Sequence, residues 1–146
     1  MSIGATSARL LFVCVSLSGT ATLARVAQSG RTIWDGVYTD AQAKRGEAVY
    51  ADRCASCHAP DLTGIDQAPP LVGADFMTEW NELAVNDVFE RIRVSMPADK
   101  PDSLERPQVA EVIAFLLQKN GAAPGPMDLP VATDALKDIK VAAKRQ

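Results

Sequence analysis

Cys54-Ala55-Ser56-Cys57-His58 is the stretch of sequence that decides the fold of this chain. The pattern C-x-x-C-H is the attachment signature of a c-type haem. Two thiols on one turn can each form a thioether to a vinyl group, and His58 then lies under the iron as its proximal ligand. A zinc site would need two more soft ligands, and a thioredoxin-like site would need a strand-to-helix turn before the motif; the sequence indicates neither. We therefore predict one covalent haem c, held by Cys54, Cys57 and His58.

The start of the chain has the features of a secretory signal peptide. Arg9 is the only charged residue before Arg25, and the residues between them are apolar at first and then small. The uncharged stretch 10–24 has 15 residues, whereas a transmembrane helix needs about 20 that are predominantly apolar. We therefore predict a signal peptide at residues 1–24 and export to the periplasm. An uncleaved membrane anchor is the alternative.

Cleavage at residue 24, with Ala21 and Ala27 as rival sites, would leave 122 residues, the size of one small domain. It would remove Cys14, so no spare thiol would remain for a disulfide. It would also leave 14 bases against 18 acids, a formal charge of −4. Such a domain is a poor candidate for binding nucleic acid and suits a partner with a basic docking rim. After cleavage we expect no stable membrane span.

The remaining chain is predicted to be all-α, with helices packed around the haem. Four segments carry the apolar spacing or the capping residues of a helix: 39–54, 75–80, 87–95 and 107–120. Residues 133–141 are expected to form one more short helix, and no segment has the pattern of a strand. We divide the chain into a lead-in segment at 25–38, a haem domain at 39–120, and a linker and tail at 121–146.

The sixth ligand of the iron decides what such a haem can do. The chain has a single histidine, so the opposite face cannot receive a second one. Met96 is the preferred ligand, because it lies at a helix-to-loop break and is followed by Pro97. Met77 is expected to fill the core and Met127 to be exposed. His/Met ligation closes the iron to oxygen and peroxide, which predicts an electron carrier and not an enzyme.

The residues around the haem are predicted from weaker signals. His58 should donate its free ring N–H to a backbone carbonyl, from Pro69 or, as the preferred partner, Pro70. Three side chains carry N–H donors for the haem propionates: Trp80, Arg91 and Arg93. We favour Trp80 and Arg93. The alternatives are plain core packing for Trp80 and a solvated position for an arginine.

Residues 39–120 resemble a class I cytochrome c. The features that carry the resemblance are Gly46-x-x-x-Tyr50 before the C-x-x-C-H motif, Pro70-Leu71, Met96-Pro97, and Phe115 on the last helix. The resemblance implies a class I cytochrome c fold, in which the first and last helices cross closely at glycine and aromatic positions. It also implies His58 and Met96 as axial ligands, and the carbonyl of Pro70 as the partner of His58.

A narrower resemblance covers Trp34-Asp35-Gly36-Val37-Tyr38-Thr39 and Gln42-Ala43-x-Arg45-Gly46. This stretch is similar to small cytochromes, and to fused cytochrome domains, found with pyrroloquinoline-quinone dehydrogenases. It implies a quinoprotein dehydrogenase as electron donor and an oxidase or another cytochrome as acceptor. The chain is too short to hold a quinoprotein propeller, so the dehydrogenase is expected to be a separate polypeptide.

Three functions are compatible with these predictions. The favoured one is a soluble one-electron carrier that docks weakly through the haem edge near Cys54 and Cys57. The second is a haem subunit held permanently by a dehydrogenase or oxidase complex, with Trp34, Tyr38 and the tail as its interface. The third is a ligand-binding or peroxidatic haem protein, in which Met96 would have to leave the iron.

Overall fold

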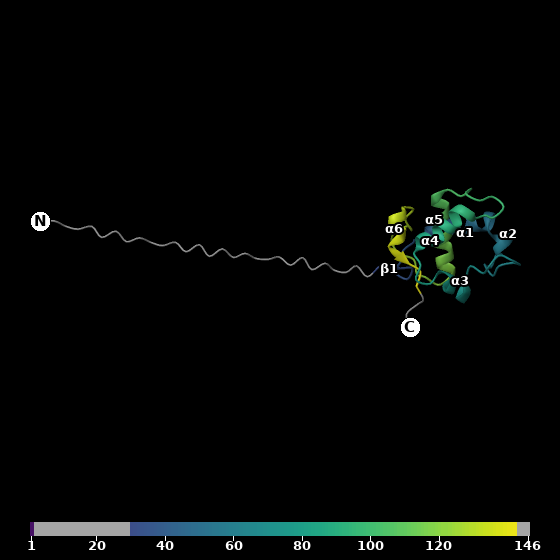
Figure 1. Cartoon of the computed structure of the whole chain (residues 1–146), viewed down its shortest axis with the longest axis horizontal. Helices are drawn as coiled ribbons and strands as arrows, with labels where there is room; N and C mark the ends of the chain where they lie inside the picture. Colours follow the sequence, from purple (N-terminus) through teal and green to yellow (C-terminus); the bar gives the residue numbers. More distant parts are fainter. Residues whose placement is uncertain (2–29, 143–146) are drawn as a thin grey trace.

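The computed structural model describes Met1 and residues 30–142. The predicted signal peptide therefore lies, apart from Met1, outside the described residues. The elements are β1 (Arg31–Thr32), α1 (Asp40–Arg53), α2 (Ala55–His58), α3 (Gly73–Trp80), α4 (Val85–Ser95), α5 (Arg106–Lys119), α6 (Thr133–Lys137) and β2 (Ile139–Lys140). Figure 1 shows α6 and β1 at one end of the folded body and α2 at the opposite end.

The helices begin where the sequence offers a partner for their free N–H groups. The hydroxyl of Thr39 accepts from the backbone N–H of Gln42, 3.1 Å away, at the start of α1. At the start of α4 the carboxylate of Asp87 accepts from the N–H of Ala84 at 2.9 Å. Pro107 lies in the first turn of α5. The four strongest helical predictions are thus confirmed, with ends shifted by a few residues.

The closest crossing in the core is that of α1 and α5, and it depends on Gly46. A Cβ on this residue would lie only 1.8 Å from the carbonyl oxygen of Glu111. One turn further along, the rings of Tyr50 and Phe115 pack with their centroids 5.3 Å apart. The predicted all-α class I cytochrome c fold is confirmed, including the reason for a glycine inside α1.

The described residues contain two short strands, which the sequence analysis did not predict. β1 and β2 pair in parallel, with Arg31 opposite Ile139 and Thr32 opposite Lys140. Strands of two residues are too short to show an alternating pattern. The helix expected at 133–141 is also corrected: α6 ends at Lys137, because the chain then extends to pair with β1.

The predicted lead-in and tail pack into the same core as residues 39–120. Among the described residues of these two segments, eight apolar side chains are buried: Ile33, Val37, Tyr38, Ala122, Leu129, Leu136, Ile139 and Val141. The hydroxyl of Tyr38 donates to the carbonyl of Ala122 at 2.5 Å. The side chain of Gln42 makes two hydrogen bonds to the backbone of Leu129, of 3.0 and 2.6 Å. Chain ends that are far apart in sequence therefore lie side by side.

Among the described residues, no helix is long and apolar enough to cross a membrane.

Candidate haem attachment site

The C-x-x-C-H motif forms a single turn at the end of α1. Cys54 ends α1, its N–H donating to the carbonyl of Tyr50 at 2.9 Å. Its own carbonyl accepts from the N–H groups of Cys57 and His58, at 3.1 and 2.9 Å. Both cysteines are free thiols; Cys54 is half-buried and Cys57 exposed. Before haem attachment, burial raises the pKa of the Cys54 thiol to about 11, and Arg53 offsets this only slightly.

The imidazole of His58 is buried and oriented by a single backbone contact. Its Nδ1 lies 2.9 Å from the carbonyl oxygen of Pro69. A carbonyl oxygen can only accept, so Nδ1 carries the ring hydrogen and the neutral ring keeps a lone pair on Nε2. Nε2 is therefore the nitrogen available to an iron.

This contact corrects the prediction for Pro70, because the acceptor is the carbonyl of Pro69. Nδ1 carries a single hydrogen, and it donates this hydrogen to one carbonyl oxygen. Only one of the two can face the ring. The sequence narrowed the choice to these two residues but could not decide which carbonyl turns toward His58.

Residues 59–72, which we call the haem loop, form hydrogen bonds within the loop and to the helices on either side. The N–H of Gly64 donates to the carbonyl of His58 at 3.0 Å, and that of Leu71 to Leu62 at 2.8 Å. The buried hydroxyl of Tyr50 donates to the carbonyl of Ala59 at 2.6 Å. Burial raises the pKa of Tyr50 to about 12, so the hydroxyl keeps its proton across the physiological range. The sequence placed Tyr50 on the inner face of α1 but gave no sign of this bond.

The apolar surroundings of the motif fit a large apolar cofactor. One core cluster contains Tyr50, Leu62, Phe76, Val112, Phe115 and Leu116. The side chains that pack against it but stay partly exposed are Val49, Cys54, Ala55, Leu71, Val72, Met77, Trp80 and Ile92. They come from α1, α2, α3, α4 and the haem loop, and a bound macrocycle would remove apolar surface from water. Two free thiols and one oriented imidazole are the donors that haem c needs.

The methionines lie where the sequence analysis expected them. Met96 ends α4 with an extended backbone, its N–H donating to the carbonyl of Ile92 at 3.0 Å, and its side chain is half-buried. Met77 is half-buried against the core, and Met127 is 65% exposed. Binding of the iron by Met96 stays a prediction.

The two predicted propionate contacts have different surroundings. Trp80 ends α3, half-buried against both core clusters. Arg93 is engaged with acids: its Nε lies 2.8 Å from Glu90 and its Nη1 3.2 Å from Asp102. A propionate contact from Arg93 would therefore use the remaining N–H groups of Nη1 and Nη2. Arg91 is exposed.

A helical domain with this thiol and imidazole arrangement is a c-type cytochrome with one haem. More particularly, the chain belongs to the family described as cytochrome c oxidase, cbb3-type, subunit III, whose model matches residues 41–116. The protein carries a covalently bound haem c. When bound, the haem iron supplies a one-electron redox couple.

Two known proteins are similar to this chain. The fructose dehydrogenase cytochrome subunit of Gluconobacter japonicus is 32% identical over 117 residues, which cover 68% of this chain and 23% of that protein. A chain in the crystal structure of the sulfane dehydrogenase SoxCD from Paracoccus pantotrophus is 26% identical, with a TM-score of 0.49. That match covers 62% of this chain and 53% of the other. The chain thus spans about a quarter of the curated relative.

Proposed function

We propose that this protein is a periplasmic one-electron carrier whose haem iron is bound by His58 and Met96. The observation that carries the proposal is the hydrogen bond between His58 Nδ1 and the carbonyl of Pro69, 2.9 Å long. It fixes the ring and presents Nε2 as the ligand atom. Met96 ends α4 in a half-buried position, which supports its role as the second ligand.

The ligand pair explains why the protein would carry electrons and not catalyse a reaction. A thioether and an imidazole complete six-coordinate iron, so no position is left for oxygen or peroxide. The buried position of His58 and the hydrogen-bonded haem loop hold its ring in place when the charge on the iron changes. We propose Trp80 and Arg93 as donors to the propionates, Arg93 through the N–H groups that its two acidic partners leave unused.

We propose a dehydrogenase as the electron donor and an oxidase or another cytochrome as the acceptor. The likeness to a cytochrome subunit of a fructose dehydrogenase supports a dehydrogenase partner. The exposed Cys57 places the attachment turn at the surface, where weak and transient docking can occur. A quinoprotein donor rests on the resemblance of residues 34–46 alone.

A permanently bound haem subunit is the second candidate, because the curated relative is itself a subunit. Tyr38 is fully buried, so it would not form the interface as predicted, whereas Trp34 is half-buried and most of the described tail residues are not buried. Val131 in the tail and Leu83 before α4, which are 40% and 43% exposed, are apolar side chains available to a partner. The second candidate predicts co-elution with a dehydrogenase from exported extract at high salt, whereas the carrier elutes alone.

The iron-ligand proposal is tested by mixing the reduced holoprotein with carbon monoxide. Wild type and Met77→Ala should keep their spectra, because Met96 blocks the sixth position in both. Met96→Ala should bind carbon monoxide and shift its Soret band. Rapid binding by wild type would contradict the proposal and favour a ligand-binding haem protein.

A further inference from the structure

We propose that Gly64 is a positioning residue for the haem ligand His58. The absence of a side chain at Gly64 lets the 68–70 backbone lie close enough for the carbonyl of Pro69 to reach His58 Nδ1. The inference deepens the proposed function and rests on it, since His58 matters to the redox potential only as the axial ligand.

The first observation is the lack of space for a side chain at Gly64. A Cβ there would lie 2.3 Å from the carbonyl oxygen of Ala68, 2.9 Å from the carbonyl carbon of Pro69 and 3.1 Å from the nitrogen of Pro70. All three are backbone atoms, so they cannot yield as a flexible side chain would. The atoms that would be displaced include the carbonyl that faces His58.

The second observation is that Gly64 is tied to His58 from the other side. Its N–H donates to the carbonyl of His58 at 3.0 Å, while its φ of +79° is a conformation that glycine adopts without strain. Gly64 thus lies between the backbone of the ligand and the acceptor of the ligand's ring. Any displacement of the 68–70 segment would lengthen the contact between Nδ1 and Pro69.

The consequence for the haem follows from the chemistry of the imidazole. A hydrogen bond from Nδ1–H to a carbonyl makes the ring a more basic ligand. A more basic ligand favours the ferric over the ferrous state. Loss of the bond should therefore raise the midpoint potential without removing either axial ligand.

Gly73 provides a matched control within the same chain. Its φ is +77°, nearly the same as that of Gly64, and a Cβ there would meet nothing within 4 Å. Gly73→Ala therefore imposes the same backbone strain without pressing on Pro69. A difference between Gly64→Ala and Gly73→Ala in midpoint potential or in exchange of the His58 ring proton therefore reports the contact of the added Cβ with the 68–70 backbone. It does not report the strain of a positive φ, which both variants share.

The single histidine makes the test direct. In reduced holoprotein labelled with ¹⁵N-histidine, the Nδ1–H of His58 is followed by hydrogen exchange, alongside a redox titration. Gly64→Ala should exchange this proton faster than wild type and titrate at a higher potential, whereas Gly73→Ala should do neither. Equal behaviour of the two variants would overturn the proposal.

Two further measurements keep the test decisive. If Gly64→Ala does not fold, native-state exchange of wild type is compared at Gly64 N–H and His58 Nδ1–H. Both protons should exchange through one opening event; faster, independent exchange of the ring proton would overturn the role of Gly64. Far-red absorption reports Met96 separately, so failure of the ligand proposal is distinguishable from failure of this one.

Discussion

At the scale of single residues, the residues that attach the haem could be predicted from the sequence, but the orientation of the His58 imidazole could not. Cys54, Cys57 and His58 are adjacent, so their pattern alone predicts the cofactor. The acceptor of the imidazole depends on which of two neighbouring carbonyls turns inward, and that is a matter of backbone path. The hydroxyl of Tyr50 donates a hydrogen bond to the haem loop, and the spacing of residues in the sequence does not predict such a contact.

Tyr50→Phe should destabilise the protein by about 0.5–1.5 kcal/mol, because it removes a buried hydrogen bond to the carbonyl of Ala59, which keeps the N–H of Leu62 as its other donor. The free energy of unfolding of the oxidised holoprotein, measured with urea, checks the value. Tyr38→Phe is the matched control, since it also removes a buried hydroxyl bond, to Ala122. Both variants should lose stability, but only Tyr50→Phe should alter Soret circular dichroism. An unchanged Soret signal would show that the Tyr50 bond does not shape the haem loop.

At the scale of elements, the helices were predictable and the strands were not. The long helices show periodic apolar residues, caps and a proline near the first turn of α5, which are local signals. β1 and β2 have two residues each and exist only because the chain ends meet. Pairing between residues more than a hundred positions apart leaves no trace in a local pattern.

Because α1 and α5 cross closely at Gly46, replacing this glycine with alanine should lower the stability of the protein, whereas the same change in an exposed helix raises it. In an exposed helix, alanine is more stable than glycine by about 1 kcal/mol. At Gly46 the added Cβ would lie 1.8 Å from the Glu111 carbonyl, so Gly46→Ala should instead destabilise by about 1–3 kcal/mol. Urea unfolding measures this, with Ala48→Gly on the exposed face of α1 as control. A stabilised Gly46→Ala would mean that the helices do not cross as described.

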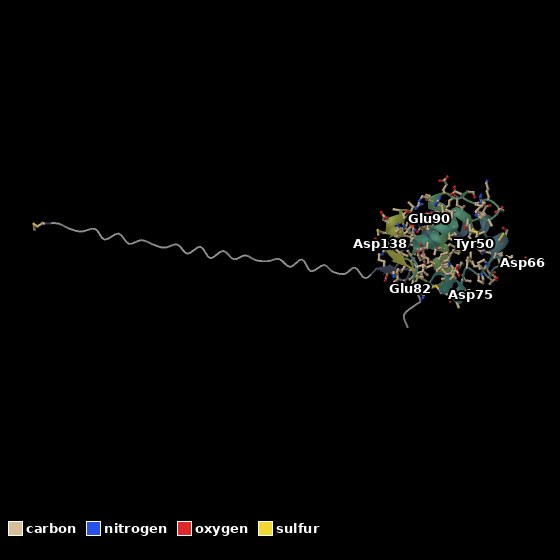
Figure 2. The ribbon with its side chains drawn as sticks, in the orientation of Figure 1. Tyr50, Asp66, Asp75, Glu82, Glu90 and Asp138 are labelled. Carbon is tan, nitrogen blue, oxygen red and sulfur yellow. The ribbon has the colours of Figure 1, made fainter. Side chains whose placement is uncertain are left out.

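At the scale of the whole molecule, the lead-in and tail complete the core. Figure 2 places Tyr50 and Asp66 toward the α2 end, far from Asp138 in the tail. The haem turn therefore lies at one end, and the junction of the chain ends at the other. Alanine, proline and glycine at 122–126 made this part of the tail look like a linker. The burial of the tail could not be predicted, because it depends on distant partners such as Ile33 and Gln42.

Leu136→Ala should cost about 2–5 kcal/mol in the free energy of unfolding, since Leu136 is fully buried in the shared core. Met127→Ala, at an exposed position of the same segment, should change it by no more than about 0.5 kcal/mol. Urea denaturation compares the two variants. Equal, small effects would contradict a tail that is part of the domain.

Far-red absorption of the oxidised holoprotein decides whether His58 and Met96 both bind the haem iron. We predict a weak sulfur-to-iron band in wild type that is kept in Met77→Ala and lost in Met96→Ala. A wild type without this band, or a band that survives in Met96→Ala, would contradict the account.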